Sequence, residues 1–140
     1  MVTLRVNITT TGKLFTQDQG PVIARMTSNI IRELAQKGES RLDEVLRPRP
    51  AGVYLSIAEA QRGHGSTGHF RRSVNTLHGP RSSTIQSDVV YGPWLEGDSA
   101  RNATTRFKGY QSFRKTAQWL VKQANTIMTK HVNAFIRDIN

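Results

Sequence analysis

The strongest constraint on the fold is a helical repeat of apolar residues that begins near Tyr110 and continues to about residue 138. Apolar side chains recur there at every third or fourth position: Phe113, Ala117, Leu120, Val121, Ala124, Ile127, Met128, Val132, Phe135 and Ile136. The opposite face carries Arg114, Lys115, Lys122 and Lys130. This spacing predicts an amphipathic helix of about eight turns over residues 110–138, whose apolar face needs another element to cover it.

A second helix is predicted over residues 21–47. Pro21 suits the first turn of a helix, where its missing N–H would have no partner. Apolar residues then recur at helical spacing, as Val22, Ile23, Met26, Ile30, Leu34, Leu42, Val45 and Leu46. Gly38 weakens the middle of this helix. Pro48 and Pro50 end it, because proline excludes the helical conformation at the residue before it.

The remaining patterns alternate between apolar and polar residues, as short strands do. In residues 2–9 the apolar side chains of Val2, Leu4, Val6 and Ile8 share one face, and the segment up to residue 20 follows as a polar arm. Residues 53–96 hold further alternating or β-prone stretches, at 53–57, 70–77, 83–87 and 88–95, and are predicted to form an antiparallel β-meander. Residues 97–109 are predicted to be a long polar loop.

Together these elements predict one α+β domain over residues 1–140, in which a small antiparallel β-sheet packs against two long amphipathic helices, with an N-terminal strand and arm at residues 1–20. There is no cysteine, which excludes a disulfide framework and fits assembly in a reducing compartment. No apolar run is long enough to cross a membrane, and the first ten residues do not resemble a signal peptide.

Charge is the strongest compositional feature. Twenty Lys and Arg residues against ten Asp and Glu give a net charge of +10. Most of the excess lies in residues 62–130, which hold eleven basic and three acidic residues, whereas residues 1–61 hold eight and six. Such a surface attracts polyanions or acidic protein faces, and the plainer interpretation is a solvated basic surface.

No motif in the sequence requires an enzyme. Gly63, Gly65 and Gly68 match G-x-G-x-x-G, but the pattern lacks the preceding strand and following helix that a dinucleotide-binding fingerprint needs. His64 and His69 lie close together without a third metal ligand nearby. There is also no nucleophile elbow. We therefore expect a protein without catalytic residues, metal or cofactor.

Three segments are similar to the signatures of one family. Residues 67–74, TGHFRRSV, resemble a strand that opens with threonine–glycine, an apolar residue, an arginine and a serine–aliphatic pair. Residues 91–97, YGPWLEG, resemble a later strand that ends in tyrosine, an aromatic or aliphatic residue, and glutamate followed by glycine or phenylalanine. Residues 106–114, RFKGYQSFR, resemble the stretch before a final helix. The family is that of the neck or tail-completion (head–tail joining) proteins of siphovirus tailed bacteriophages, and the similarity covers about residues 20–138.

The resemblance implies a non-enzymatic virion protein that forms a ring in the head-to-tail connector or at the head-proximal end of the tail. The partners it implies are copies of the chain itself, usually in a six-fold ring, then neighbouring connector and tail-tube or tail-terminator proteins, and genomic DNA in the channel. Assembly would take place in the bacterial cytoplasm, with no membrane involved. The alternative, from charge and aromatic content, is a sequence-independent nucleic-acid-binding protein.

Two sets of residues are candidates for these contacts. The predicted ring interface comprises Trp94, Glu96, Asp98, Arg101, Asn102, Arg106 and Lys108, and for Trp94 the alternative is burial under the final helix. Candidates for contact with DNA or an acidic partner are Arg71, Arg72, Arg81, Arg114 and Lys115. In a strand Arg71 and Arg72 would point to opposite faces, so that one reaches a partner and the other pairs with an acid such as Glu96. We favour protein contacts for most of the arginines, because tight phosphate contacts would hinder the sliding of DNA.

Overall fold

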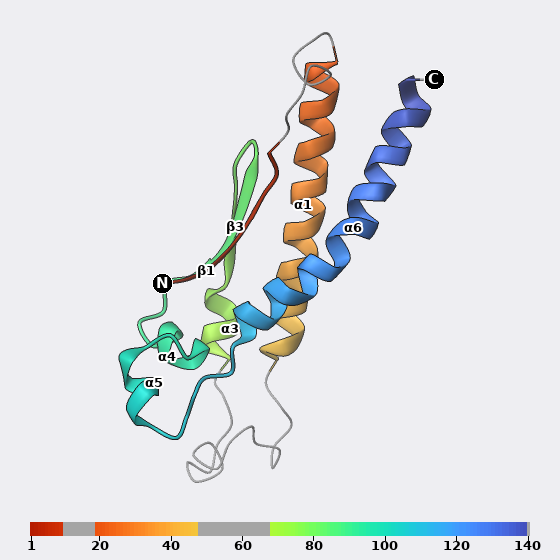
Figure 1. Cartoon of the computed structure of the whole chain (residues 1–140). Helices are drawn as coiled ribbons and strands as arrows, with labels where there is room; N and C mark the ends of the chain where they lie inside the picture. Colours follow the sequence, from red (N-terminus) through yellow and green to blue (C-terminus); the bar gives the residue numbers. More distant parts are fainter. Residues whose placement is uncertain (10–18, 48–67, 140) are drawn as a thin grey trace.

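In a computed structural model, which describes residues 1–9, 19–47 and 68–139, a three-stranded sheet lies against two long helices (Figure 1). In chain order the elements are β1 (Val2–Asn7), α1 (Gly20–Val45), α3 (His69–Ser73), β2 (Asn75–His78), β3 (Ser82–Ser87), α4 (Gly92–Glu96), α5 (Ala100–Thr104) and α6 (Ser112–Ile139). The predicted α+β class is confirmed, with an antiparallel sheet and long N-terminal and C-terminal helices.

The sheet has the order β1-β3-β2, and both of its strand pairs are antiparallel. The N-terminal strand is therefore an integral part of the sheet, since Val2 pairs with Ser87 and Leu4 with Ile85. Its predicted alternation is confirmed, because Val2 and Leu4 are buried whereas Thr3 is exposed. β1 and β2 are both edge strands, and edge strands keep unpaired backbone groups.

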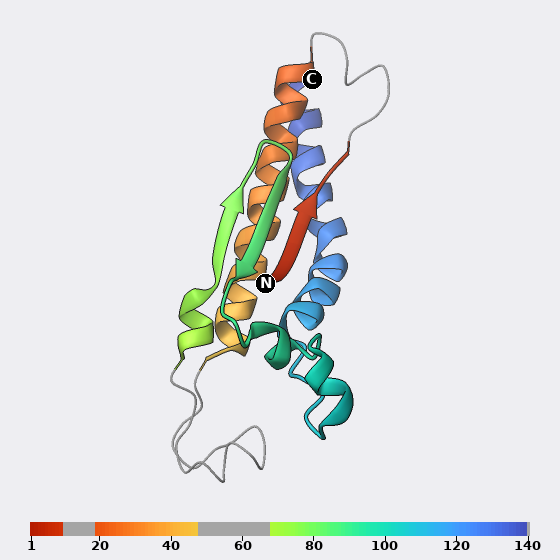
Figure 2. The same ribbon diagram turned by 90° about the vertical axis from the view of Figure 1, so that its left-hand side faces the viewer.

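One face of the sheet is covered by α1 and α6, which lie behind the strands in the face-on view of the sheet (Figure 2). The core forms between these layers from residues such as Ile85, Leu42 and Leu120. Gly38 lies at their closest approach, because a Cβ atom there would come within 2.9 Å of side-chain atoms of both Ile85 and Leu120. The glycine that weakens α1 in sequence terms is thus what lets the helix pack this closely.

The two long helices match their predicted bounds within two residues, as Gly20–Val45 against 21–47 and Ser112–Ile139 against 110–138. Pro21 lies in the first turn of α1, as predicted. The long apolar repeats of α1 and α6 are strong local signals for helix. Burial of the apolar face of each helix against the rest of the core then stabilises it beyond its helix propensity.

The short elements differ from the prediction. The strand expected at residues 70–77 begins instead with α3, and β2 starts only at Asn75. The β-prone stretch at residues 83–87 is confirmed as β3, whereas the one at residues 88–95 leads into α4, and the loop expected at residues 97–109 contains α5. A helix of five residues is too short to show a 3.6-residue period, so alternation and helix look alike at this length.

Several predictions fall outside the described residues. These are the polar arm over residues 10–18, the short strand at 53–57, and the positions of Gly63, Gly65 and His64. Gly68 is described, and its φ of 73° places it just before α3 in the left-handed region that favours glycine. Among the described helices, none is both long enough and apolar enough to cross a membrane.

Candidate functional site

Residues 91–111, which carry much of the family resemblance, fold into a small unit beside the first turn of α6 (Figure 1). We call these residues the cap. It contains α4, with Pro93 in the first turn, and α5, whose N-terminus is capped by the Ser99 hydroxyl. Because it consists of short helices and tight turns, its shape depends on side-chain hydrogen bonds rather than on a hydrophobic core of its own.

Asn102 lies at the centre of the cap and is 3% exposed. Its Nδ2 donates to the carbonyl oxygens of Trp94 (3.0 Å) and Phe107 (3.1 Å), and its Oδ1 accepts from the backbone N–H of Ser99 (3.1 Å). One buried amide therefore joins α4, α5 and the segment after α5. This corrects the prediction that Asn102 faces a neighbouring subunit, because its polar atoms are used inside the cap.

The two ends of the loop between α4 and α6 meet at Gly97 and Gly109. Both glycines have positive φ, at 97° and 89°. A Cβ atom on Gly97 would overlap the carbonyl oxygen of Lys108, and one on Gly109 would overlap the backbone of Gly97. Beside them the backbone N–H of Tyr110 donates to the carbonyl oxygen of Leu95 at 2.6 Å. The loop is thus closed by a backbone approach that only glycine permits.

Glu96 connects the cap to α6. It is 3% exposed, and its two carboxylate oxygens accept the backbone N–H of Phe113 at 3.1 and 3.0 Å. Burial raises the pKa of Glu96, while backbone N–H groups of the first turn of α6 act in the opposite direction. The carboxylate satisfies helix donors that have no partner within the helix. Glu96 therefore anchors α6, which corrects its predicted place at a subunit interface.

Three partly buried aromatic rings pack against one another in the cap, with an arginine beside them. The rings of Trp94 and Phe107 are 4.7 Å apart, and Phe107 and Tyr110 are 4.9 Å apart. The guanidinium of Arg101 lies over Trp94, 5.8 Å from the ring centroid. Trp94 packs within the cap, and its Nε1–H is buried without a hydrogen-bond partner among the described residues. A buried donor of this kind is costly, so it marks a position where the cap is not optimised for stability alone.

The predicted basic residues of this region have different environments. Lys108 Nζ donates to the carbonyl oxygens of Asn102 (2.8 Å) and Ala103 (3.2 Å), and Arg114 pairs with Asp98 at 3.0 Å. Arg106 and Lys115 are exposed, and within the described part of the chain neither forms an ion pair. Three cations, those of Arg101, Arg106 and Lys115, therefore remain directed to solvent or a partner.

Arg71 serves the fold. Its Nε and Nη2 bind the two carboxylate oxygens of Asp43 at 2.6 and 2.7 Å, which joins α3 to the end of α1. This hydrogen bonding lowers the pKa of Asp43 and raises that of Arg71. The prediction of a strand with Glu96 as the acidic partner is wrong, because residues 69–73 are helical and Asp43 is the partner. Arg72 and Arg81 are exposed, on α3 and in the β2–β3 turn.

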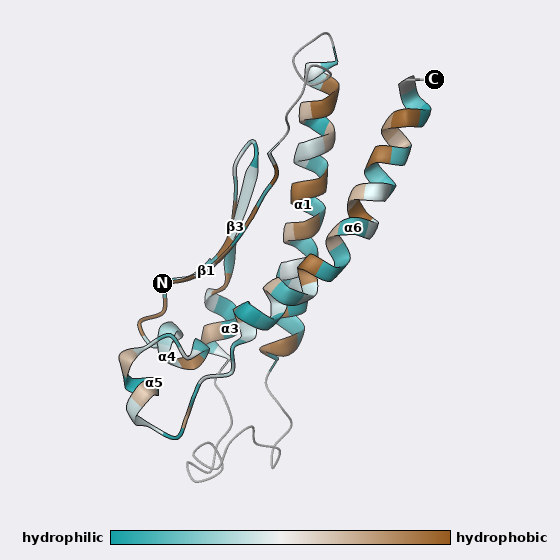
Figure 3. Ribbon diagram, viewed as in Figure 1, coloured by the Kyte–Doolittle hydropathy of each residue, from teal (hydrophilic) through white to brown (hydrophobic). Residues whose placement is uncertain are grey.

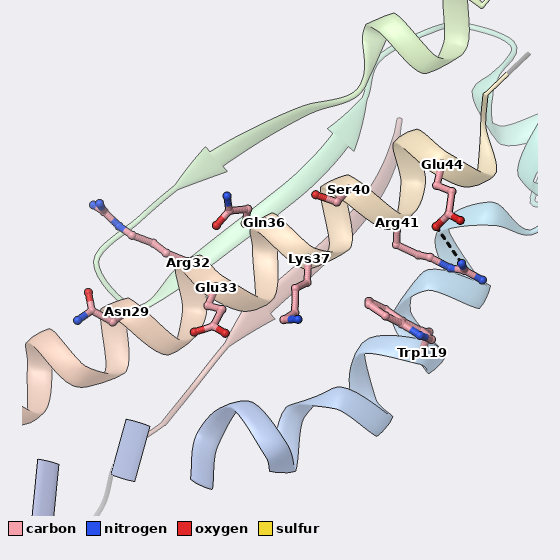
Figure 4. Close-up of a pocket in the computed structure, with 9 residues that line it drawn as sticks. All are labelled: Asn29, Arg32, Glu33, Gln36, Lys37, Ser40, Arg41, Glu44 and Trp119. Atoms are coloured by element: carbon pink, nitrogen blue, oxygen red, sulfur yellow. Dashed lines mark hydrogen bonds and ion pairs between the residues drawn. The ribbon is translucent and has the colours of Figure 1, made fainter. Parts of the chain in front are cut away.

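A second polar region, which the sequence did not indicate, is an open groove of about 700 Å³ between α1 and Trp119 of α6 (Figure 4). The guanidinium of Arg41 lies 5.7 Å from the centroid of Trp119 and pairs with Glu44 at 3.1 Å. The other groove acid, Glu33, pairs with Lys130 of α6 at 3.0 Å. Arg32 and Lys37 form no ion pair with another described residue, so the groove keeps a positive charge.

In the part of the chain that the structure describes, no cluster of three or more His, Cys, Asp or Glu residues could hold a metal ion. No protein-family model matches the chain, and no curated protein sequence and no solved structure is significantly similar to it. The arrangement of the cap can therefore be interpreted only from its own chemistry. That chemistry combines exposed cations with partly buried aromatic rings.

Proposed function

We propose that the chain is a structural virion protein of a tailed bacteriophage, a ring-forming neck or tail-completion component that joins capsid to tail around the DNA channel. The cap is the observation that carries the proposal. The residues that resemble the family signature, 91–97 and 106–114, lie together in three dimensions at the start of α6. The order of the long elements, a helix, then strands, then a helix, also agrees with the architecture that the resemblance implies.

The rigidity of the cap supports this proposal. A connector subunit must present the same surface to its neighbours in every copy, and a preformed surface loses less entropy on binding. Asn102, Glu96 and the two close glycines hold the cap in one shape, while Arg101, Arg106 and Lys115 remain outside. Aromatic and arginine side chains are frequent anchors of protein interfaces. The surface suits an acidic face on a neighbouring ring.

The proposal is tested in the phage whose genome encodes this chain. We expect deletion of the gene to leave filled heads and separate tails, which negative-stain electron microscopy distinguishes from joined particles. We expect complementation by the wild-type gene to restore joining, whereas Arg101→Ala, Arg106→Ala and Lys115→Ala together restore it at least about tenfold less well, since each interface anchor contributes about 1 kcal/mol or more.

A matched control removes charge elsewhere. Arg5→Ala and Arg25→Ala change exposed cations on β1 and α1 and should complement like the wild type. Circular dichroism checks that each variant is folded. Joined, infectious particles in the deletion strain would overturn the proposed function, and equal losses in both sets of variants would overturn the role of the cap.

The groove beside Trp119 favours a second candidate, a sequence-independent nucleic-acid-binding protein. Arg32, Lys37 and an aromatic ring in one open groove resemble the combination with which single strands are held, by phosphate contacts and stacking. A mobility-shift gel with single-stranded DNA separates the two candidates. Micromolar binding that Lys37→Ala and Trp119→Ala abolish would favour this second function over the connector.

A further inference from the structure

The N-terminal strand β1 leaves one of its edges free. It pairs with β3 from Val2 to Asn7, no other described strand pairs with it, and Figure 2 shows it as the outermost strand on that side. In an antiparallel pair every second residue directs its N–H and C=O away from the partner strand. The pairing with β3 is one to one, without a bulge, and β1 contains no proline. The free edge therefore carries backbone donors and acceptors that neither of these devices blocks.

An open groove of about 420 Å³ follows this free edge, between β1 and the first turns of α6. Val2, Thr3 and Leu4 all line the groove on the side of the strand. Successive side chains of a strand point to opposite faces of its sheet, so three consecutive residues can line one groove only where it follows the edge of the strand. On the opposite side the groove is lined by Phe113 and Ala117 of α6.

The α6 side of the groove continues as an apolar surface. Val121 and Met128 follow Ala117 by four and eleven residues, about one and three helical turns, so the three side chains lie on the same side of α6. Val121 is 73% exposed and Met128 38%. Figure 3 shows apolar residues recurring along α6 to its last turns. A strand added to the free edge would have apolar side chains of α6 on one side and solvent on the other.

We infer that the free edge of β1 binds an extended, acidic segment of a different protein, which adds a fourth strand to the sheet. Backbone hydrogen bonds to the edge supply the affinity, and the side chains at alternate positions supply the selectivity. Those that face Ala117 and Val121 are apolar, and those that face solvent are polar. Only an extended backbone matches a row of donors and acceptors with the spacing of a strand.

The charge of the chain selects for an acidic partner and against a second copy. Two copies paired edge to edge would bring together two chains that each carry a net charge of +10. Asp98, which lines one end of the groove, belongs to the cap, where Arg101 and Arg106 are exposed. An acidic segment is attracted to this field, whereas a second basic chain is repelled. The inference goes beyond the proposed function and does not depend on it, because it rests on β1 and α6.

A peptide selection tests the inference. A library of random peptides of about twelve residues, which extend over about 40 Å and so span β1 with both flanks, is selected against the purified full chain. We expect the enriched peptides to have apolar residues at alternate positions and a net negative charge. Their binding should slow amide hydrogen exchange at every second residue of β1 at least about tenfold, as measured by nuclear magnetic resonance.

Each other outcome would overturn the inference. Slow exchange at these β1 amides in the free protein would show that the chain itself already occupies the edge. A library without enriched peptides, or enriched peptides that protect residues outside β1, would show that the edge binds no such segment. Enriched peptides without negative charge would contradict the acidic partner. The proposed function is decided separately, by the phenotype of the gene deletion.

Two changes locate the contact. Val121→Lys puts a charge on the apolar side of the groove and should weaken the best enriched peptide at least about tenfold, because burial of a valine side chain contributes more than that to affinity. Leu77→Lys is the matched control, since Leu77 is 57% exposed on β2, at the opposite edge of the sheet, and binding should not change. Circular dichroism checks that both variants are folded. Equal losses in the two variants would overturn the assignment of the groove.

Methylation of the peptide backbone tests the strand pairing itself. N-methyl groups at alternate positions remove the N–H donors on one edge of the peptide and leave those on the other edge. We expect one of the two methylated series to lose binding at least about tenfold, because its donors face β1, and the other to bind like the parent peptide. Two series that both bind like the parent would overturn the addition of a strand to β1.

Discussion

The two halves of α6 are held in different ways. In the N-terminal half Phe113, Thr116 and Leu120 are buried, and Glu96 occupies the donors of the first turn. In the C-terminal half Ile127 is buried, but Met128, Val132 and Ile136 are partly exposed, and Glu33 of α1 lies 3.0 Å from Lys130 and 2.6 Å from His131. Hydrophobic burial is strong and insensitive to salt, whereas partly exposed ion pairs are weak. The first half is therefore buried more completely, and the second half leaves more of its apolar side chains exposed.

The largest expected effect is at the buried end. Glu96→Ala removes the acceptor for the Phe113 N–H and leaves donors of the first turn buried without a partner. We expect the free energy of unfolding in urea to fall by about 2–4 kcal/mol. Glu96→Gln keeps an acceptor oxygen and should lose less than half of that amount. Asp98→Ala removes an exposed neighbouring carboxylate and is the matched control.

A Glu96→Ala protein as stable as the Asp98→Ala protein would contradict the assignment of Glu96 as the anchor of α6. Burial of Phe113 and Leu120 alone would then distinguish the first half of the helix from the second.

A smaller effect is expected inside the cap. Asn102→Ala removes three hydrogen bonds that join α4, α5 and Phe107, and we expect a loss of about 1–3 kcal/mol. Hydrogen exchange should quicken first at residues 97–109, because the cap opens before the core. Asn102→Asp keeps only the acceptor for Ser99 and should behave nearly as Asn102→Ala does. Unchanged exchange in the cap would argue that the glycine contact alone closes it.

The smallest effect is expected at the exposed end. Glu33→Gln weakens the contact between α6 and α1 and should cost less than about 1 kcal/mol. Hydrogen exchange at residues 130–138 is the sensitive measurement, with Glu39→Gln on the same helix as the control. Faster exchange at the first turn of α6 than at its last turns would reverse the comparison.

A lower pH should increase the difference in local stability between the two halves of α6. Hydrogen bonding with His131 and Lys130 lowers the pKa of Glu33, so its stabilisation is present above the unfolded-state pKa and is lost as the pH falls through the folded-state value. The pKa of Glu96 is raised, so its contribution favours the folded state at low pH and is lost as the pH rises through its folded-state pKa. Between about pH 5 and 3 the last turns of α6 should loosen while its first turn stays protected. Hydrogen exchange followed across that range checks the order.

Part of the candidate site could be predicted from local patterns. The exposure of Arg101 and Arg106, which the polar composition of residues 97–109 predicts, is confirmed, whereas a subunit interface there stays a prediction. Glu96 and Asn102 were placed at an interface because polar residues in a loop are usually exposed. Their burial depends on Phe113 and Trp94, whose backbones reach them only after the chain has turned. The pairing of Arg71 with Asp43, 28 residues away, is equally invisible in sequence.

By itself the sequence determined the elements whose signal is repeated along the chain: the two long amphipathic helices, the alternating strand β1, the α+β class and the basic charge. These follow from periodicity and composition, which are local properties. Only the tertiary structure decided that residues 69–73 and 92–96 are helical and that Glu96 and Asn102 are internal. Each of these features depends on contacts between residues far apart in the sequence. A helix of five residues is also too short to show a helical period in the sequence.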